Sequence, residues 1–165
     1  MIFTEFRFFP FMLVTLAVYW GLRGNGPRKL WLLACSYYFY SCWDWRFLAL
    51  LAGTTLIDYL VALAITASDD DRVRKRWLVI SLVANLGVLG FFKYFNFFIE
   101  SAAALTAWIG LPVKVTTLEI VLPVGISFYT FQSMSYTIDV YRRRIPAERS
   151  FTDFALFVSF FTHLV

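Results

Sequence analysis

Ionisable residues inside apolar stretches are the first candidates for chemistry in this chain. Asp58 lies near the middle of one such stretch, and Lys93 lies in the outer half of another. Placing a charged side chain at the centre of a bilayer costs about 2.5–3.5 kcal/mol, so such a group is expected to face protein or water and to have a partner. One interpretation is that Asp58 and Lys93 pair with each other. The alternative is that Lys93 extends to the membrane surface while Asp58 bonds neighbouring hydroxyls.

Polar side chains also gather along residues 121–140, at spacings that place them on two faces of a helix. The first face carries Ser127, Thr130, Ser133 and Thr137, and the second carries Gln132, Ser135 and Asp139. A helix that is polar on two sides cannot face lipid on both, because unpaired polar groups are costly there. We therefore expect this helix inside a bundle. Either it lines a cavity or tunnel, or its polar groups hydrogen-bond between helices.

The remaining reactive side chains give weaker signals. Cys35 and Cys42 are seven residues apart, about 10 Å along a helix, which is too far for a disulfide, so we interpret them as small apolar fillers. The single histidine, His163, is expected to cap or pack rather than to catalyse. The spacings predict no metal site and no catalytic residue in this chain. Asp69–Asp71 read as a solvated turn.

The composition indicates that these residues lie in a membrane. The chain has 165 residues, of which 60% are hydrophobic, 19 are phenylalanine, and the net charge is +4. Its mean hydropathy is +0.67. A soluble domain of this size buries only about 70% of its unfolded surface, too little to hide so much apolar area. The positive charge sits in the connecting segments and forms no basic stripe on a soluble face, which argues against nucleic-acid binding.

The cations alternate between rich and poor gaps along the chain. The gaps Arg23–Lys29, Ser68–Arg76 and Tyr141–Ser150 hold three, four and four cations, eleven of the fifteen Lys and Arg residues. The gaps between them hold few. Because basic loops stay on the cytoplasmic side, we expect a multi-pass membrane protein whose N-terminus is extracytoplasmic.

The pattern predicts an all-α, polytopic membrane protein with about five to six transmembrane or re-entrant helices in a single membrane domain, 1–165. A short surface helix and a loop are expected over Ser101–Ile120, and Pro123 with Gly125 suggests a broken entry into the fifth segment. The expected apolar segments are Phe6–Leu22, Leu30–Cys42, Phe47–Ala67, Trp77–Glu100, Val121–Val140 and Phe151–Val165.

Two longer motifs resemble a known family. They are Phe92-Lys93-Tyr94-Phe95-Asn96-Phe97-Phe98, and the run from Leu122-Pro123-Val124-Gly125-Ile126-Ser127 to Asp139-Val140-Tyr141-Arg142. Leu56–Val61 and Phe157–Phe161 fit the same pattern. Together they are similar to the N-terminal part of the membrane-bound O-acyltransferase family, and most of all to its bacterial alginate O-acetylation branch.

The resemblance implies an incomplete bundle of an enzyme that transfers an acyl group, commonly acetyl, to hydroxyls of an extracytoplasmic polysaccharide such as alginate. The donor would be acyl-CoA or an acyl carrier, with no bound cofactor, and the partners would be the bilayer and periplasmic polysaccharide-modification proteins. The family's catalytic histidine lies further downstream, and His163 does not match its position. The chain stops inside an apolar run, so we expect a piece of a longer polypeptide that is inactive alone.

A function from another class fits the same residues. Asp58, Lys93 and the polar face of residues 121–140 would suit an ion path in a small membrane transporter or channel subunit.

Overall fold

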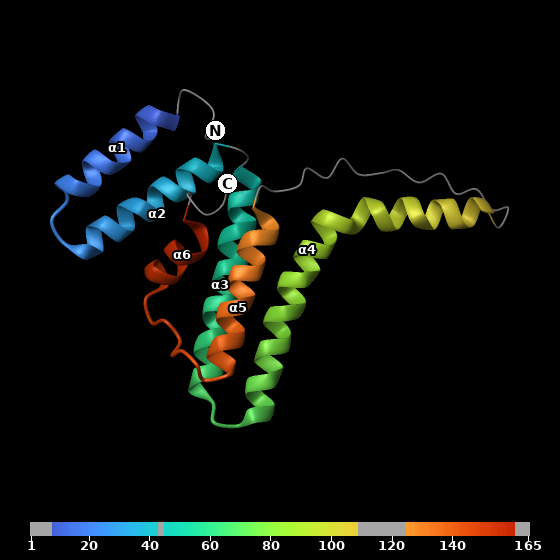
Figure 1. Ribbon diagram of the computed structural model, residues 1–165. Coiled ribbons are helices and arrows are strands. Elements are labelled where there is room, and N and C mark those ends of the chain that lie inside the picture. The colour runs from blue at the N-terminus through green and yellow to red at the C-terminus, as the bar shows by residue number, and fades with distance from the viewer. Residues whose placement is uncertain (1–7, 43–44, 109–124, 161–165) are drawn as a thin grey trace.

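The structure, a computed structural model, describes residues 8–42, 45–108 and 125–160. Within these ranges all regular structure is helical, which confirms the predicted all-α membrane class. Figure 1 shows the six described helices. They are α1 (Phe8–Gly21), α2 (Asn25–Ser41), α3 (Trp45–Ala67), α4 (Asp71–Trp108), α5 (Ile126–Tyr141) and α6 (Phe151–Ser159).

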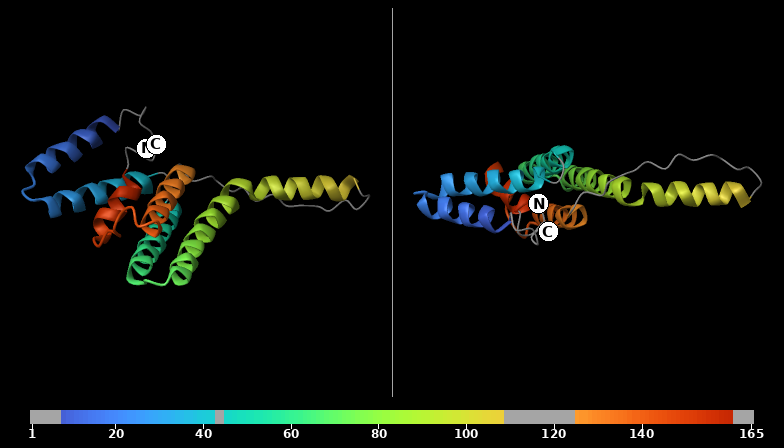
Figure 2. Two further views of the ribbon diagram at one scale, coloured as in Figure 1. Left: turned by 60° about the horizontal axis from the view of Figure 1, so that its bottom comes forward. Right: turned by 90° about the horizontal axis from the view of Figure 1, so that it is seen from above.

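Helices α3, α4 and α5 form the centre of the molecule. Helix α4 packs against both α3 and α5, while α5 also packs against α3. Helices α3 and α5 run in the same direction and α4 runs against them (Figure 1). Helix α6 packs on α2, α3 and α5. Helices α1 and α2 form an antiparallel hairpin that is steeply inclined to the three central helices, as both views of Figure 2 show.

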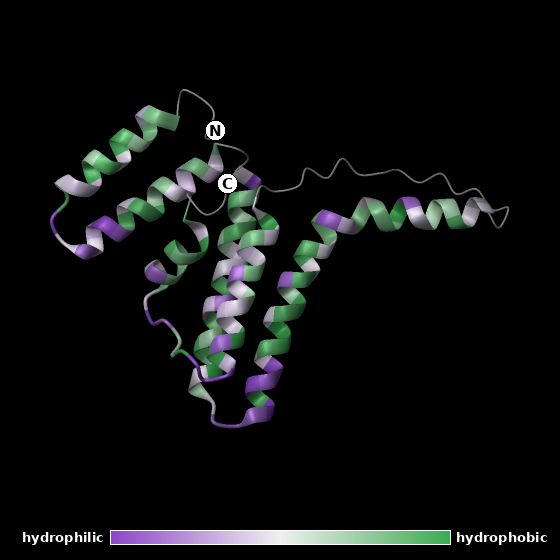
Figure 3. Ribbon diagram, in the orientation of Figure 1, coloured by the Kyte–Doolittle hydropathy of each residue, from purple (hydrophilic) through white to green (hydrophobic). Residues whose placement is uncertain are grey.

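Two helical stretches are long and apolar enough to cross a bilayer, Trp45–Ala67 and Asp71–Phe95. The first has 23 residues. At a rise of 1.5 Å per residue it is about 35 Å long, enough for a hydrocarbon core of about 30 Å. Figure 3 shows hydrophobic residues along the lengths of these helices and hydrophilic residues where α3 and α5 end and α4 begins. Large apolar side chains such as Leu60 and Val83 point outward, 54% and 65% exposed, as lipid contact requires.

Two helix starts differ from the prediction. The second apolar segment was expected to begin at Leu30, but α2 begins earlier, at Asn25, and Pro27 lies in its first turn. Proline fits the first turn of a helix because no N–H is needed there, so the break is made by Gly24, whose φ is 103°. Helix α4 likewise begins before Trp77, at Asp71, because the Asp70 side chain accepts a hydrogen bond from the Arg72 amide at 2.8 Å. The basic cluster therefore lies on the first turns of a helix rather than in a loop.

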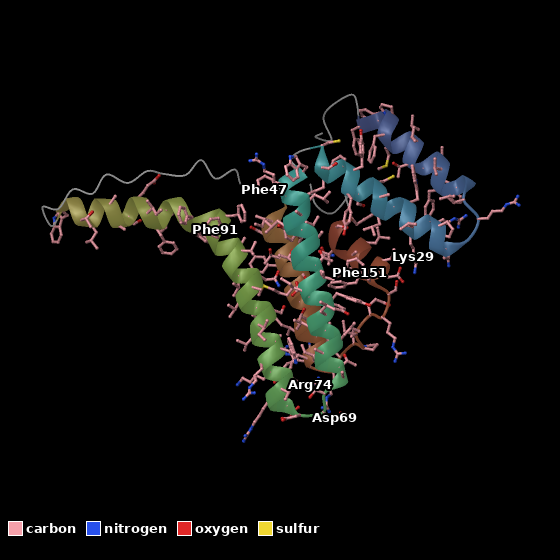
Figure 4. The ribbon with its side chains drawn as sticks, turned by 180° about the vertical axis from the view of Figure 1, so that it is seen from behind. Lys29, Phe47, Asp69, Arg74, Phe91 and Phe151 are labelled. Carbon is pink, nitrogen blue, oxygen red and sulfur yellow. The ribbon has the colours of Figure 1, made fainter. Side chains whose placement is uncertain are left out.

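The end of α4 also differs from the prediction. A separate surface helix was expected after Ser101, whereas α4 continues without interruption to Trp108. The helix bends, so that its C-terminal part points away from the bundle; Phe91, labelled in Figure 4, lies near the bend. Residues 109–124 lie outside the described residues; they contain the rest of the predicted Ser101–Ile120 segment and Pro123 at the start of the predicted fifth segment, and His163 also lies outside.

Helices α5 and α6 have clear local causes for their boundaries. Helix α5 begins after Gly125, whose φ of 74° is a left-handed conformation that suits glycine. Helix α6 begins after Ser150, whose side chain accepts a hydrogen bond from the amide of Asp153 at 3.3 Å. Lys29 of α2 bonds Asp153 at 2.7 Å and joins the two helices at their N-terminal ends.

The buried core has two apolar clusters. The larger draws on α2 to α6 and lies at the end of the bundle where α3 and α5 begin; the smaller lies where they end. The members of the larger cluster are Tyr40, Phe47, Leu51, Leu89, Ile126, Tyr129, Phe154 and Val158, and those of the smaller are Val61, Ala62, Ile65 and Val140. Between the two clusters lies the polar group described next.

Candidate functional site

Asp58 is the centre of a buried polar cluster that joins the three central helices. Its carboxylate accepts hydrogen bonds from Ser81 Oγ at 2.5 Å and from Asn85 Nδ2 at 2.8 and 2.9 Å, both on α4. It also accepts a short hydrogen bond from Ser133 Oγ on α5. Asp58 and Ser81 are fully buried, and Asn85 and Ser133 are 1% and 2% exposed. One carboxylate of α3 is therefore hydrogen-bonded to both α4 and α5.

Helical periodicity on α5 explains why Ser133 reaches Asp58. The buried residues of α5 are Ile126, Tyr129, Thr130, Ser133, Thr137 and Val140, a stripe with steps of three and four residues. Three of the four polar residues predicted on the first face thus lie in the buried stripe. Thr137 Oγ1 bonds the carbonyl of Ser133 at 3.1 Å, so this threonine is satisfied within its own helix. Ser127 is half-buried.

The second predicted face of α5 has a different role at each residue. Gln132 Nε2 donates to the carbonyl of Phe157 at 2.9 Å, a group in the last turn of α6 that has no partner within its helix. Asp139 is half-buried, and Arg144 Nη1 approaches its carboxylate at 3.4 Å. Gln132 therefore joins α5 to α6, whereas Asp139 lies at the basic end of the bundle.

The structure does not bring Asp58 and Lys93 together. Lys93 is exposed and lies over the ring of Tyr94, with Nζ 5.5 Å from the ring centroid. It follows Asn85 by eight residues on α4, about 12 Å along the helix axis. Among the described residues, no Lys or Arg forms a salt bridge with Asp58. The donors to Asp58 are hydroxyl and amide groups, which was the alternative interpretation.

Ser81 and Asn85 were not among the site residues predicted from the sequence. Both lie inside the apolar segment of α4 and are four residues apart, so they face the same way on a helix. That spacing was a usable signal, because two polar residues on one face of a spanning helix need a polar neighbour.

The cluster is suited to holding helices rather than to covalent chemistry. Three side chains donate to one carboxylate, and this replaces the water that the group loses on burial. Within the described residues no group of His, Cys, Asp and Glu side chains could hold a metal ion. In the same part of the chain, the carboxylate of Asp58 accepts the hydrogen bond of the Ser133 hydroxyl.

The fold and the site together define part of a polytopic helical membrane protein in which polar side chains hold the central helices. No protein-family model and no solved structure matches the chain. Several curated proteins do match the chain. The chain is 46% identical over 158 residues to "Probable alginate O-acetylase AlgI" of Pseudomonas aeruginosa, and the match covers 95% of this chain and 30% of that protein.

Two further relatives widen the comparison. The protein of the same name from Azotobacter vinelandii is 43% identical over 159 residues, covering 94% of this chain and 32% of that protein. A "Peptidoglycan O-acetyltransferase" from Helicobacter pylori is 34% identical over 161 residues, covering 83% of this chain and 30% of that protein. These matches confirm the predicted relationship: the chain is a homologue of the alginate O-acetylases of the membrane-bound O-acyltransferase family and spans about a third of their length.

The buried cluster leads to a stability prediction for Asn85→Leu. Leucine has a similar size and suits a membrane. It removes the two hydrogen bonds that the Asn85 side-chain amide donates to Asp58, and it leaves a buried carboxylate with fewer hydrogen-bond donors. We expect the variant to lose about 2–4 kcal/mol of unfolding free energy. Unfolding in mixed detergent micelles measures the change.

The matched control is Ser135→Ala, on an exposed face of α5, which should change stability by less than about 0.5 kcal/mol. Equal stability of Asn85→Leu and the parent chain would contradict the role assigned to the cluster.

Proposed function

We propose that the chain is part of a membrane O-acyltransferase that transfers an acetyl group to hydroxyls of an extracytoplasmic polysaccharide such as alginate. The observation that carries this proposal is the 46% identity to an alginate O-acetylase over 95% of the chain. The aligned region covers nearly the whole chain, so the similarity is not confined to one apolar helix.

In this proposal the chain contributes helices that wall the tunnel, and the rest of the protein contributes the catalytic base. A histidine downstream would remove the proton from the sugar hydroxyl, whose oxygen attacks the acyl carbon of a thioester donor as the carbon–sulfur bond breaks. The donor would be acyl-CoA or an acyl carrier. The Asp58 cluster would fix the position of α5 in the wall of the tunnel that contains this reaction, while the face of α5 with Thr130, Ser133 and Thr137 is buried between helices.

The proposed location is the bacterial inner membrane, with the N-terminus extracytoplasmic and with periplasmic proteins of polysaccharide modification as partners. Two of the three basic segments support the orientation, because the start of α4 and the end of α5 lie at the same end of the bundle (Figure 3). The third, at the turn between α1 and α2, lies away from this end, to the side of the bundle on the inclined hairpin (Figure 1).

The transporter alternative loses its main argument in this arrangement. It relied on an intramembrane pair of Asp58 with Lys93, and these residues have different partners.

Acetyl transfer tests the proposed function directly. Membranes containing the longest form that the gene encodes should transfer labelled acetyl groups to alginate, whereas membranes with residues 1–165 alone should transfer none, because the base is absent. Immunoblotting of both membranes controls for the amount of protein. Transfer by residues 1–165, or no transfer by the longer form with any acyl thioester, would contradict the proposal.

Side-specific labelling tests the proposed orientation. Cysteines placed at Asn25 and Lys114, in a background without Cys35 and Cys42, should differ in intact cells: the reagent reaches position 114 from outside and does not reach position 25. After the cells are lysed both positions should react. The reverse pattern in intact cells would overturn the orientation.

A further inference from the structure

A cleft of about 390 Å³ lies where α3 and α5 end and α4 begins, and three arginines are among the residues that line it. Arg74 comes from α4, and Arg143 and Arg144 come from the turn after α5; Thr66 of α3 completes the polar wall. Figure 4 shows Arg74 at this end of the molecule, close to the turn that contains Asp69. Three arginines from two segments thus line one space.

The turn that contains Arg143 and Arg144 places an arginine in a backbone conformation that favours glycine. The Arg143 amide donates to the carbonyl of Val140 and the Arg144 amide to the carbonyl of Asp139, both at 3.0 Å. This is the Schellman pattern, which ends a helix with one left-handed residue that is usually glycine. Here that residue is Arg143, with φ of 59°, the one described residue other than glycine with a positive φ. A long side chain at a position that favours glycine is a local cost, and such costs concentrate at functional sites.

Arg74 gives the cleft a rigid floor. It is only 5% exposed, and its Nη2 donates to the carbonyl of Tyr141 at 2.7 Å and to that of Val140 at 3.4 Å. These carbonyls belong to the last turn of α5 and have no partner inside the helix. The buried guanidinium therefore joins the start of α4 to the end of α5 and fixes the turn that carries the other two arginines.

The carboxylates near Arg143 and Arg144 leave their charges largely available. Asp71 lies 3.8 Å from Arg143, and Asp139 lies 3.4 Å from Arg144, in both cases with arginine side chains more than 60% exposed. Exposed pairs at such distances contribute little and are readily exchanged. Guanidinium groups bind phosphate oxygens in a two-point geometry that a distant carboxylate does not match.

We propose that this cleft binds a phosphate group, held by Arg143 and Arg144 above the buried Arg74. Two sources share this chemistry. One is the headgroup of an anionic phospholipid, whose phosphate lies at the depth where α3, a helix of spanning length, ends. The other is a soluble phosphate ester from the aqueous side. The site is separate from the Asp58 cluster, and it does not depend on the proposed acyl transfer.

The test uses the longest encoded form of the protein in a zwitterionic detergent. Native mass spectrometry measures retained phosphatidylglycerol against phosphatidylcholine, and a thermal unfolding series measures the shift caused by inorganic phosphate or pyrophosphate. We expect the parent protein to prefer a phosphate-bearing anion in one of these arms. Arg143→Gly and Arg144→Gln should each weaken that binding by about tenfold, the effect of one charged hydrogen-bonding partner.

Two controls separate binding from folding and from bulk charge. Arg143→Gly replaces a left-handed arginine with the residue that the turn favours, so its unfolding temperature without ligand should equal or exceed that of the parent. Arg142→Gln removes the same charge from the same turn, but Arg142 lies outside the lining of the cleft and its loss should change binding less than threefold.

The outcomes decide both the site and the source. Selective retention of phosphatidylglycerol supports a lipid site, and a thermal shift by free phosphate or pyrophosphate supports a soluble ligand. The proposal is overturned if neither arm shows binding, or if Arg142→Gln weakens binding as much as Arg143→Gly and Arg144→Gln do.

Discussion

The bonds that Asp58 accepts are the interaction on which the central bundle depends. A single carboxylate on α3 accepts hydrogen bonds from Ser81 and Asn85 of α4 and from Ser133 of α5. In a membrane, apolar side chains gain little by leaving lipid for protein, so burial alone does not select one helix arrangement. Buried donors and a buried acceptor do select one, because each is costly when it is left without a partner. This fixes the register of α4 and α5 on α3.

Further contacts hold the helices together on both sides of Asp58. On one side of Asp58 the larger apolar cluster brings in α2 and α6, and on the other side Val61, Ile65 and Val140 pack below it. At the far end, Arg74 bonds the last carbonyls of α5 and ties α4 to it a second time. The two buried polar contacts lie at different depths along α4, so together they resist both rotation and sliding of this helix.

Much of this arrangement could be predicted from the sequence, and the failures have physical causes. Composition and apolar segments predicted the membrane class, and helical periodicity placed Thr130, Ser133 and Thr137 on one buried face. The start of α4 was placed too late because charged residues read as a loop, although Asp70 can cap a helix and Asp71 in the first turn complements the helix dipole. The partner of Asp58 could not be chosen, because sequence gives spacing along each helix but not the relative rotation of two helices. Ser81 and Asn85 were overlooked because short polar side chains barely lower the hydropathy of a long segment.

The most direct measurement of this account is a double-mutant cycle between Asp58→Asn and Ser133→Ala, followed by unfolding in mixed micelles. If the carboxylate holds α5 through Ser133, the two substitutions should be coupled by about 1 kcal/mol or more. The parallel cycle of Asp58→Asn with Ser135→Ala should show a coupling near zero, because Ser135 is exposed and bonds the Gln132 carbonyl of its own helix. Strict additivity in the Ser133 cycle would contradict the claim that this buried contact determines the packing of the central helices.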